Sequence, residues 1–220
     1  MNHELLATVA LLLLFLMLIG ITNYLYKHFG WTSEKSRKFI HVAGGLLCLV
    51  GFSFIHSHWY VLALCAIAFT ILLFTFIKKS LPSIHNTSRV SFGSILFPIP
   101  IYISFLAADY GHTGLYFYLP TSLLTISDTL AEWGGNKWGH RTMAFFARQK
   151  TLAGSLCFAI SSFVISCFLI SWFMKPKPLQ LVAYSCLCMF VTTLAELLTL
   201  KGFDNLTVPV SALILIYLIA

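Results

Sequence analysis

Long apolar runs separated by short polar segments occupy most of this chain, and they constrain its fold more than any other feature. A helix needs about 20 apolar residues to cross a hydrocarbon core of roughly 30 Å. Only 10% of the residues are charged and 59% are hydrophobic, which leaves too little polar surface for a water-soluble globule. The sequence therefore predicts an all-α, polytopic transmembrane helix bundle. The expected helices are Leu5–Tyr24, Phe39–Ile55, Trp59–Ile77, Phe92–Ala108, Thr113–Ile126, Leu152–Phe173, Leu179–Leu200 and Thr207–Ala220.

About eight helices are expected, or seven if one of the two short runs does not cross the membrane. The short runs are the fifth and the eighth, and a tilted or broken helix is tolerated where it lies inside a bundle. No soluble domain, low-complexity tract or internal repeat is visible. Residues 1–220 are therefore expected to form a single integral membrane domain whose chemistry lies in its loops and helix ends.

The basic residues gather on one side of this expected topology. Twelve of the fourteen Lys and Arg residues follow odd-numbered runs, and only Lys175 and Lys177 lie opposite. Because short cytoplasmic loops carry the excess positive charge, these loops are expected to face the cytoplasm and both termini the outside. A compact chain with no evident transit peptide fits a bacterial inner membrane. Basic stretches interleaved with aromatic residues are absent, so the lipid bilayer, and not nucleic acid, is the expected partner.

Four of the seven acidic residues lie beside or inside membrane-length apolar runs: Asp128, Glu132, Glu196 and Asp204. Carboxylates are costly to keep near lipid, so these residues are functional-site candidates. Asp128, Glu132 and Asn136 are spaced four apart, which places them on one face if the helix continues. Oxygen ligands of this kind favour Mg²⁺. The expected metal ligands are Asp128 with Glu132 or Asp204.

Glycine and basic residues accompany these acids. Gly134, Gly135 and Gly139 are expected to interrupt the helix and to let the backbone approach a phosphate closely. In the expected topology the basic segments meet the acids at the cytoplasmic side, where they would bind phosphate oxygens. Plain positive-inside flanks and a solvated loop are the alternatives. The candidate nucleotide- and phosphate-binding residues are Arg37, Lys38, Arg89, Gly135, Lys137, Gly139 and Lys150.

Four segments, read in order, resemble the polyprenol kinase family: RKFIH, RVSFGSILFP, SDTLAEWGGNKWG with KTLAGS, and AELLTLKGFDNLTVP. This family includes phytol kinases, dolichol kinases and CTP-dependent diacylglycerol kinases. The resemblance implies a membrane enzyme that transfers the γ-phosphoryl group of a nucleoside triphosphate, commonly CTP, to a lipid alcohol. The residues that match the family's motifs are Arg37, Lys38, Asp128, Gly135, Gly139, Lys150, Glu196 and Asp204.

The chain departs from the family pattern at Ser127, where the family usually has glycine. It also lacks a long basic loop after the fifth helix that would fix a nucleotide base. CTP as the phosphoryl donor is therefore implied by the resemblance alone, and neither the lipid alcohol nor the oligomeric state can be read from the residues.

Phosphoryl transfer depends mainly on positioning and charge stabilisation, and a general base must lie within reach of the lipid hydroxyl. The candidate catalytic residues are Asp128, Glu196 and His41, and the sequence does not choose a base among them. For Glu196 the alternative is an ion pair that holds the bundle together.

Two other functions fit parts of the same pattern. A CTP:phosphatidate cytidylyltransferase also joins CTP, Mg²⁺ and a lipid. Its C-terminal signature has a His-Gly-Gly run and an Asp-Arg-x-Asp element, whereas this chain has Gly-Phe-Asp-Asn-Leu-Thr. An ion- or proton-coupled transporter would place charges near the bilayer midplane and show an internal repeat. The acids here cluster at one face with glycines and cations, which favours the kinase.

Overall fold

The computed structural model describes residues 3–85, 92–139, 150–200 and 202–219, and helices account for almost all of them. No β-strand occurs in this part of the chain, so the predicted all-α fold class is confirmed. A π-helical segment, η2 (Leu123–Ser127), joins α7 to α8, and a short 3₁₀ turn, η1 (Phe52–Phe54), follows α2. The helices are α1 (His3–His28), α2 (Ser33–Gly51), α3 (His58–Lys78), α4 (Pro82–His85), α5 (Gly93–Leu96), α6 (Pro98–Gly111), α7 (Leu115–Ser122), α8 (Asp128–Trp138), α9 (Leu152–Met174), α10 (Pro178–Leu198) and α11 (Asp204–Ile219).

Six helical stretches of the described chain are long and apolar enough to cross a membrane. They coincide with six of the eight predicted runs. The remaining two are the runs that the sequence showed to be short. The fifth becomes an unbroken helical stretch through residues 115–138, and the eighth becomes α11, a shorter apolar helix. The six spans are His3–His28, Ser33–Phe54, His58–Lys78, Gly93–Gly111, Leu152–Met174 and Pro178–Leu198.

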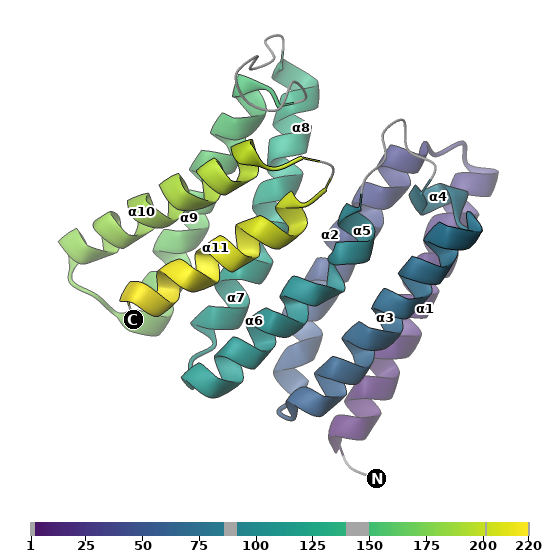
Figure 1. Ribbon diagram of the computed structural model, residues 1–220, viewed down its shortest axis with the longest axis horizontal. Coiled ribbons are helices and arrows are strands. Elements are labelled where there is room, and N and C mark those ends of the chain that lie inside the picture. Colours follow the sequence, from purple (N-terminus) through teal and green to yellow (C-terminus); the bar gives the residue numbers. More distant parts are fainter. Residues whose placement is uncertain (1–2, 86–91, 140–149, 201, 220) are drawn as a thin grey trace.

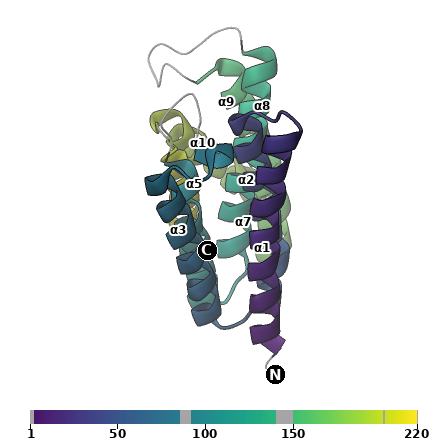
Figure 2. The ribbon, with the colours of Figure 1, turned by 90° about the vertical axis from the view of Figure 1, so that its right-hand side faces the viewer.

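Successive long helices run in opposite directions (Figure 1). As a result, one end of the molecule, the upper end in Figure 1, holds the last residues of α1, α3, α8 and α10. The first residues of α2, α9 and α11 lie at the same end. Helices α1 and α3 form the side that faces the viewer in Figure 2, and α9 and α10 lie on the opposite side of the bundle. The segments that carry the candidate residues therefore converge at the upper end.

Helix α7 lies between two apolar cores of the bundle, as expected for a helix without a wide polar face. Its residues Leu115 and Leu119 are fully buried in a core formed mainly with α9, α10 and α11. Its Phe117 packs into a second core, together with residues of α1, α2, α3 and α6. The chain continues directly from α7 into η2 and α8, so these two cores fix where Asp128 begins the latter helix.

Close helix contacts at small residues bring the upper end together. At Gly45 of α2, an added methyl group would overlap Thr125 of the π segment. At Gly154 of α9, it would lie 2.8 Å from the Ala131 carbonyl oxygen of α8, and at Gly134 it would overlap Cys157 of α9. Small residues allow membrane helices to approach backbone to backbone, so both contacts depend on the missing side chains.

The prediction that three glycines interrupt the helix is wrong for Gly134 and Gly135 and confirmed for Gly139. Gly134 and Gly135 lie inside α8, which ends only at Trp138, and Gly139 caps it with a φ of −81°. The physical reason is that these glycines serve packing: Gly134 and Gly135 lie against Cys157 and Thr151, at the contact with α9. Helix α8 therefore continues through both glycines to Trp138.

Gly45→Ala is expected to lower the stability of the protein by about 1–3 kcal/mol, because α2 must move away from Thr125 to admit the methyl group. Thermal unfolding in detergent measures the change. Gly20→Ala in α1 is the matched control, since no atom lies within 4 Å of its added methyl group. Alanine favours helix over glycine, so the control should be as stable as the wild type or more stable. Equal stability of both variants would contradict the close contact.

Candidate active site

A pocket of about 480 Å³ lies among α2, α8, α10 and α11 at the upper end and extends down between α1 and α3. Five of the seven acidic residues of the whole chain line it. Nine of the predicted site residues take part in its lining, from segments far apart in the sequence. These nine are Arg37, Lys38, His41, Asp128, Glu132, Gly135, Lys150, Glu196 and Asp204.

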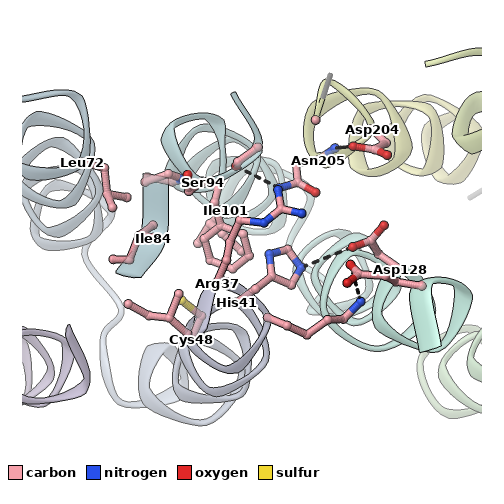
Figure 3. Close-up of a pocket in the computed structure, with 18 of the residues that line it drawn as sticks. Arg37, His41, Cys48, Leu72, Ile84, Ser94, Ile101, Asp128, Asp204 and Asn205 are labelled. Carbon is pink, nitrogen blue, oxygen red and sulfur yellow. Dashed lines mark hydrogen bonds and ion pairs between the residues drawn. The ribbon is translucent and has the colours of Figure 1, made fainter. Parts of the chain in front are cut away.

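The pocket has two chemically different parts. Figure 3 shows Arg37, His41, Asp128 and Asp204 on one side and apolar residues such as Leu72 on the other. We call the second part the apolar arm. It is lined mainly by Leu12, Phe15, Leu16 and Ile19 of α1, Leu64, Ile71 and Leu72 of α3, Cys48 and Phe52 of the α2 region, and Ile84 and Ile101.

Lys150 binds two carboxylates at once in the charged part. Its ammonium group donates to Glu196 Oε1 and to Asp204 Oδ2, the latter at 2.9 Å. Glu196 is only 3% exposed, and Lys150 and Asp204 are mostly buried as well. Burial alone would lower the pKa of Lys150, but the charges of Asp204 and Glu196 and their hydrogen bonds raise it above its usual value. Lys150 therefore stays protonated, and it ties the end of α10 and the start of α11 to the chain just before α9.

A second ion pair joins α2 to α8. Lys38 Nζ lies 2.6 Å from Glu132 Oε2, so this carboxylate already has a cationic partner. One turn earlier in α8, Asp128 Oδ2 lies 3.8 Å from His41 Nε2, which is too long for a hydrogen bond. His41 Nε2 instead contacts the backbone carbonyl oxygen of Leu124 at 2.9 Å. Asp128 thus has no lysine or arginine ion pair among the described residues.

The start of α11 is fastened from the opposite wall. The Asn205 side chain donates to the Gly93 carbonyl oxygen of α5 at 2.8 Å, and the Asn205 backbone donates to Asp204 Oδ1 at 3.1 Å. Arg37 extends across the charged part towards Asn205 (Figure 3). These contacts fix the Asp204 carboxylate at the pocket wall.

Two of the three remaining predicted site residues, Lys137 and Gly139, lie outside this lining. Lys137 lies over the rings of Trp133 and Trp138, at 4.7 and 5.1 Å from their centroids. Gly139 packs against Thr151 at the end of α8. Arg89 lies outside the described residues, so its position relative to the pocket is not given.

Glu34 and Thr151 also line the pocket but were not among the predicted site residues. Glu34 lies in the first turn of α2, three and four residues before Arg37 and Lys38, and this helical spacing is the signal that would have placed it on their face. Thr151 caps α9, where its side chain accepts from the Gly154 backbone at 3.2 Å. Thr151 follows Lys150 directly, so the cap fixes the backbone next to the lysine that binds both carboxylates.

The charge of the pocket fits a divalent cation. Among the described residues of its lining, five carboxylates face three Lys and Arg side chains, an excess of two negative charges in that part of the lining. No group of three or more His, Cys, Asp or Glu side chains in the described chain is arranged to hold a metal ion. Mg²⁺, however, commonly takes one or two carboxylates and completes its octahedral shell with phosphate oxygens and water. Asp128 and Asp204 fit that set, because both line the pocket and lie close enough to interact electrostatically.

Comparison with known proteins gives one distant relative. The chain is 26% identical over 185 residues to phytol kinase from Synechocystis sp., which covers 83% of this chain and 78% of that protein. No protein-family model matches the chain, and no solved structure matches it significantly. The similarity supports, at a distance, the resemblance to lipid kinases of the phytol and polyprenol kinase type.

Proposed function

We propose that this protein is a multi-pass membrane kinase that transfers the γ-phosphoryl group of CTP to the hydroxyl group of phytol or a polyprenol. One observation carries the proposal: a single pocket joins a wall of carboxylates and cations to an apolar arm between membrane helices. A lipid alcohol has a polar hydroxyl group and an apolar tail that match these two parts. The distant similarity to a phytol kinase supports the reaction class. CTP is the donor we propose because the family that the sequence resembles commonly uses it.

The lipid would enter the pocket with its tail in the apolar arm and its hydroxyl group at the charged part. Helices α1 and α3, which line the arm, lie on the outer side of the bundle and expose many large apolar side chains, as expected for lipid contact (Figure 2). The arm offers a lipid tail apolar surroundings like those of the bilayer, so it can accept the tail without specific polar contacts. We propose that the charged part faces the cytoplasm, because basic residues flank it. We also propose a bacterial inner membrane as the location.

The nucleotide phosphates would lie against the charged part. Asp128 and Asp204 would hold Mg²⁺, which supplies positive charge to the phosphoryl oxygens when bound. Arg37 and Lys38 lie near the start of α2 and would bind further phosphate oxygens. Lys150 keeps Glu196 and Asp204 in place by its two hydrogen bonds. In this arrangement, cations would lie on both sides of the phosphoryl group on which negative charge develops.

In the transfer step the lipid hydroxyl oxygen forms a bond to the γ-phosphorus. The bond from that phosphorus to the β,γ-bridging oxygen breaks, and the nucleoside diphosphate leaves with the bonding electrons. The hydroxyl proton goes to a general base, for which Asp128, Glu196 and His41 are the candidates. Because such transition states are loose, positioning and charge contribute more than the strength of the base.

Label transfer to lipid tests the proposal. Purified protein in lipid nanodiscs with Mg²⁺ is given CTP labelled at the γ-phosphate and, in parallel, CTP labelled at the α-phosphate and ATP labelled at the γ-phosphate. Phytol, polyprenols, diacylglycerol and phosphatidate are the acceptors. Transfer of γ-label from CTP to phytol or a polyprenol is the expected result. Transfer of α-label to phosphatidate would instead identify a cytidylyltransferase, and no transfer to any acceptor would favour transport.

A further inference from the structure

The π segment before Asp128 frees one backbone carbonyl at the pocket. The Asp128 backbone N–H donates to the Leu123 carbonyl, five residues back, instead of the Leu124 carbonyl four residues back. Pro120, which has no N–H to donate, lies one turn earlier in the same helical stretch. The Leu124 carbonyl, which Asp128 would occupy in a regular α-helix, is therefore open to another donor.

His41 of α2 is that donor. Its Nε2 lies 2.9 Å from the Leu124 oxygen, and a carbonyl oxygen can only accept, so Nε2 carries the proton. A nitrogen that already carries a proton and donates it to the backbone is not available to take one from a lipid hydroxyl. The other ring nitrogen, Nδ1, points away from Asp128 (Figure 3).

The surroundings hold the ring in this orientation. The Phe97 ring packs edge-on against His41 with centroids 4.8 Å apart. One turn further along α2, Gly45 lies directly against Thr125, the residue that follows Leu124. Two contacts, one by hydrogen bond and one by close packing, thus join α2 to successive residues of the π segment.

We propose that His41 is a positioning residue: through its Nε2–H it holds the open Leu124 carbonyl and so fixes where Asp128 enters the pocket. Asp128 follows Leu124 by four residues in the same helical stretch, so a change in the π turn rotates or shifts its carboxylate. This inference rests on the proposed function, and it gives His41 no role in proton transfer.

Amide substitutions separate positioning from proton transfer. In His41→Gln the side-chain amide nitrogen can occupy the place of Nε2 and donate to Leu124, but it cannot take up a proton. In His41→Asn the shorter amide matches the position of Nδ1 and does not reach the carbonyl. His41→Gln is expected to keep kcat within about fivefold of wild type, whereas His41→Asn and His41→Ala lose about a hundredfold, since misplacement of a reacting group by about 1 Å costs that much.

The pH profile of kcat provides a second readout. Because His41 is not the base, His41→Gln should keep the shape of the wild-type profile. A glutamine variant as inactive as the alanine variant, or one that loses the acidic limb of the profile, would overturn the proposal and make His41 the base. Size-exclusion chromatography and thermal unfolding show whether each variant is folded before its rate is compared.

A spectroscopic test does not depend on the proposed function. In ¹⁵N-histidine NMR spectra, the resonances of His41 are assigned as those missing from His41→Gln, since the chain has eight histidines. At a pH high enough for the ring to be neutral, Nε2 should show the shift of a protonated ring nitrogen and Nδ1 that of an unprotonated one. The reverse tautomer would overturn the inference whatever the protein phosphorylates. The expected tautomer without any lipid phosphorylation would leave the hydrogen bond intact and reject the proposed kinase activity.

Discussion

Replacing Asp128 by asparagine is expected to lower kcat for lipid phosphorylation by about 10³-fold, equivalent to ~4 kcal/mol of transition-state stabilisation. Asparagine keeps the size of the side chain and removes its charge. The Asp128 carboxylate has no lysine or arginine ion pair in the described structure, and His41 Nε2 is 3.8 Å away. It therefore remains available to a metal ion or to the lipid hydroxyl, and its loss is not compensated by a neighbour.

The rate of γ-label transfer, measured at saturating CTP and lipid, checks this result. Asp109→Asn is the matched control, because Asp109 is an exposed acid near the end of α6 and lies outside the pocket lining. Glu132→Gln is the second comparison: its carboxylate is paired with Lys38, so a smaller loss of about tenfold is expected. If Asp128→Asn kept the activity of the Asp109→Asn control, Asp128 would have no role in the reaction.

The positions of the helices could be predicted because they depend on local sequence. Apolar runs of membrane length correspond to helices throughout the described chain, and even the two short runs are helical. The π segment could not be predicted, because one extra residue in a helical turn does not change the apolar pattern of Leu123 and Leu124. It arises where α7 is buried between two cores and α2 supplies a donor.

The candidate site shows the same division between local and tertiary causes. Asp128 and Glu132 lie on one face of α8 because helical spacing alone requires it. Their partners come from packing: Lys38 reaches Glu132 from α2, and Lys150 reaches Glu196 and Asp204 across 46 and 54 residues of sequence. A single sequence does not show which lysine meets which acid.

The prediction failed at two of the three glycines after Glu132 for a related reason. Glycine after a charged stripe suggests a loop when only the chain itself is considered. In the structure Gly134 and Gly135 remain helical because α9 packs against them, at Cys157 and Thr151. The need for glycine comes from a neighbouring helix that lies later in the sequence, so the pattern of α8 alone does not reveal it.

Lys150→Met is expected to destabilise the protein by about 3–5 kcal/mol and to abolish lipid phosphorylation, because it leaves two carboxylates in the pocket wall without their cation. Glu196 is 3% exposed, so water replaces little of the lost interaction. Glu196 Oε2 is already buried without a hydrogen-bond partner, and loss of Lys150 would leave the whole carboxylate in that state. Thermal unfolding in detergent should show a fall in apparent Tm of about 10 °C.

A variant in which all three side chains are uncharged shows whether the loss of stability comes from the unpaired carboxylates or from the aliphatic part of the lysine side chain. Adding Glu196→Gln and Asp204→Asn to Lys150→Met removes both unpaired charges, so most of the lost stability should return. Lys137→Met is the matched control, because this exposed lysine lies over the rings of Trp133 and Trp138 and has no ion pair within the described residues, so its loss should change Tm little. Activity should not return with stability in the neutral variant, since Asp204 no longer carries the charge proposed to hold the metal ion. Recovery of both would mean that Lys150, Glu196 and Asp204 serve only to hold α9, α10 and α11 together.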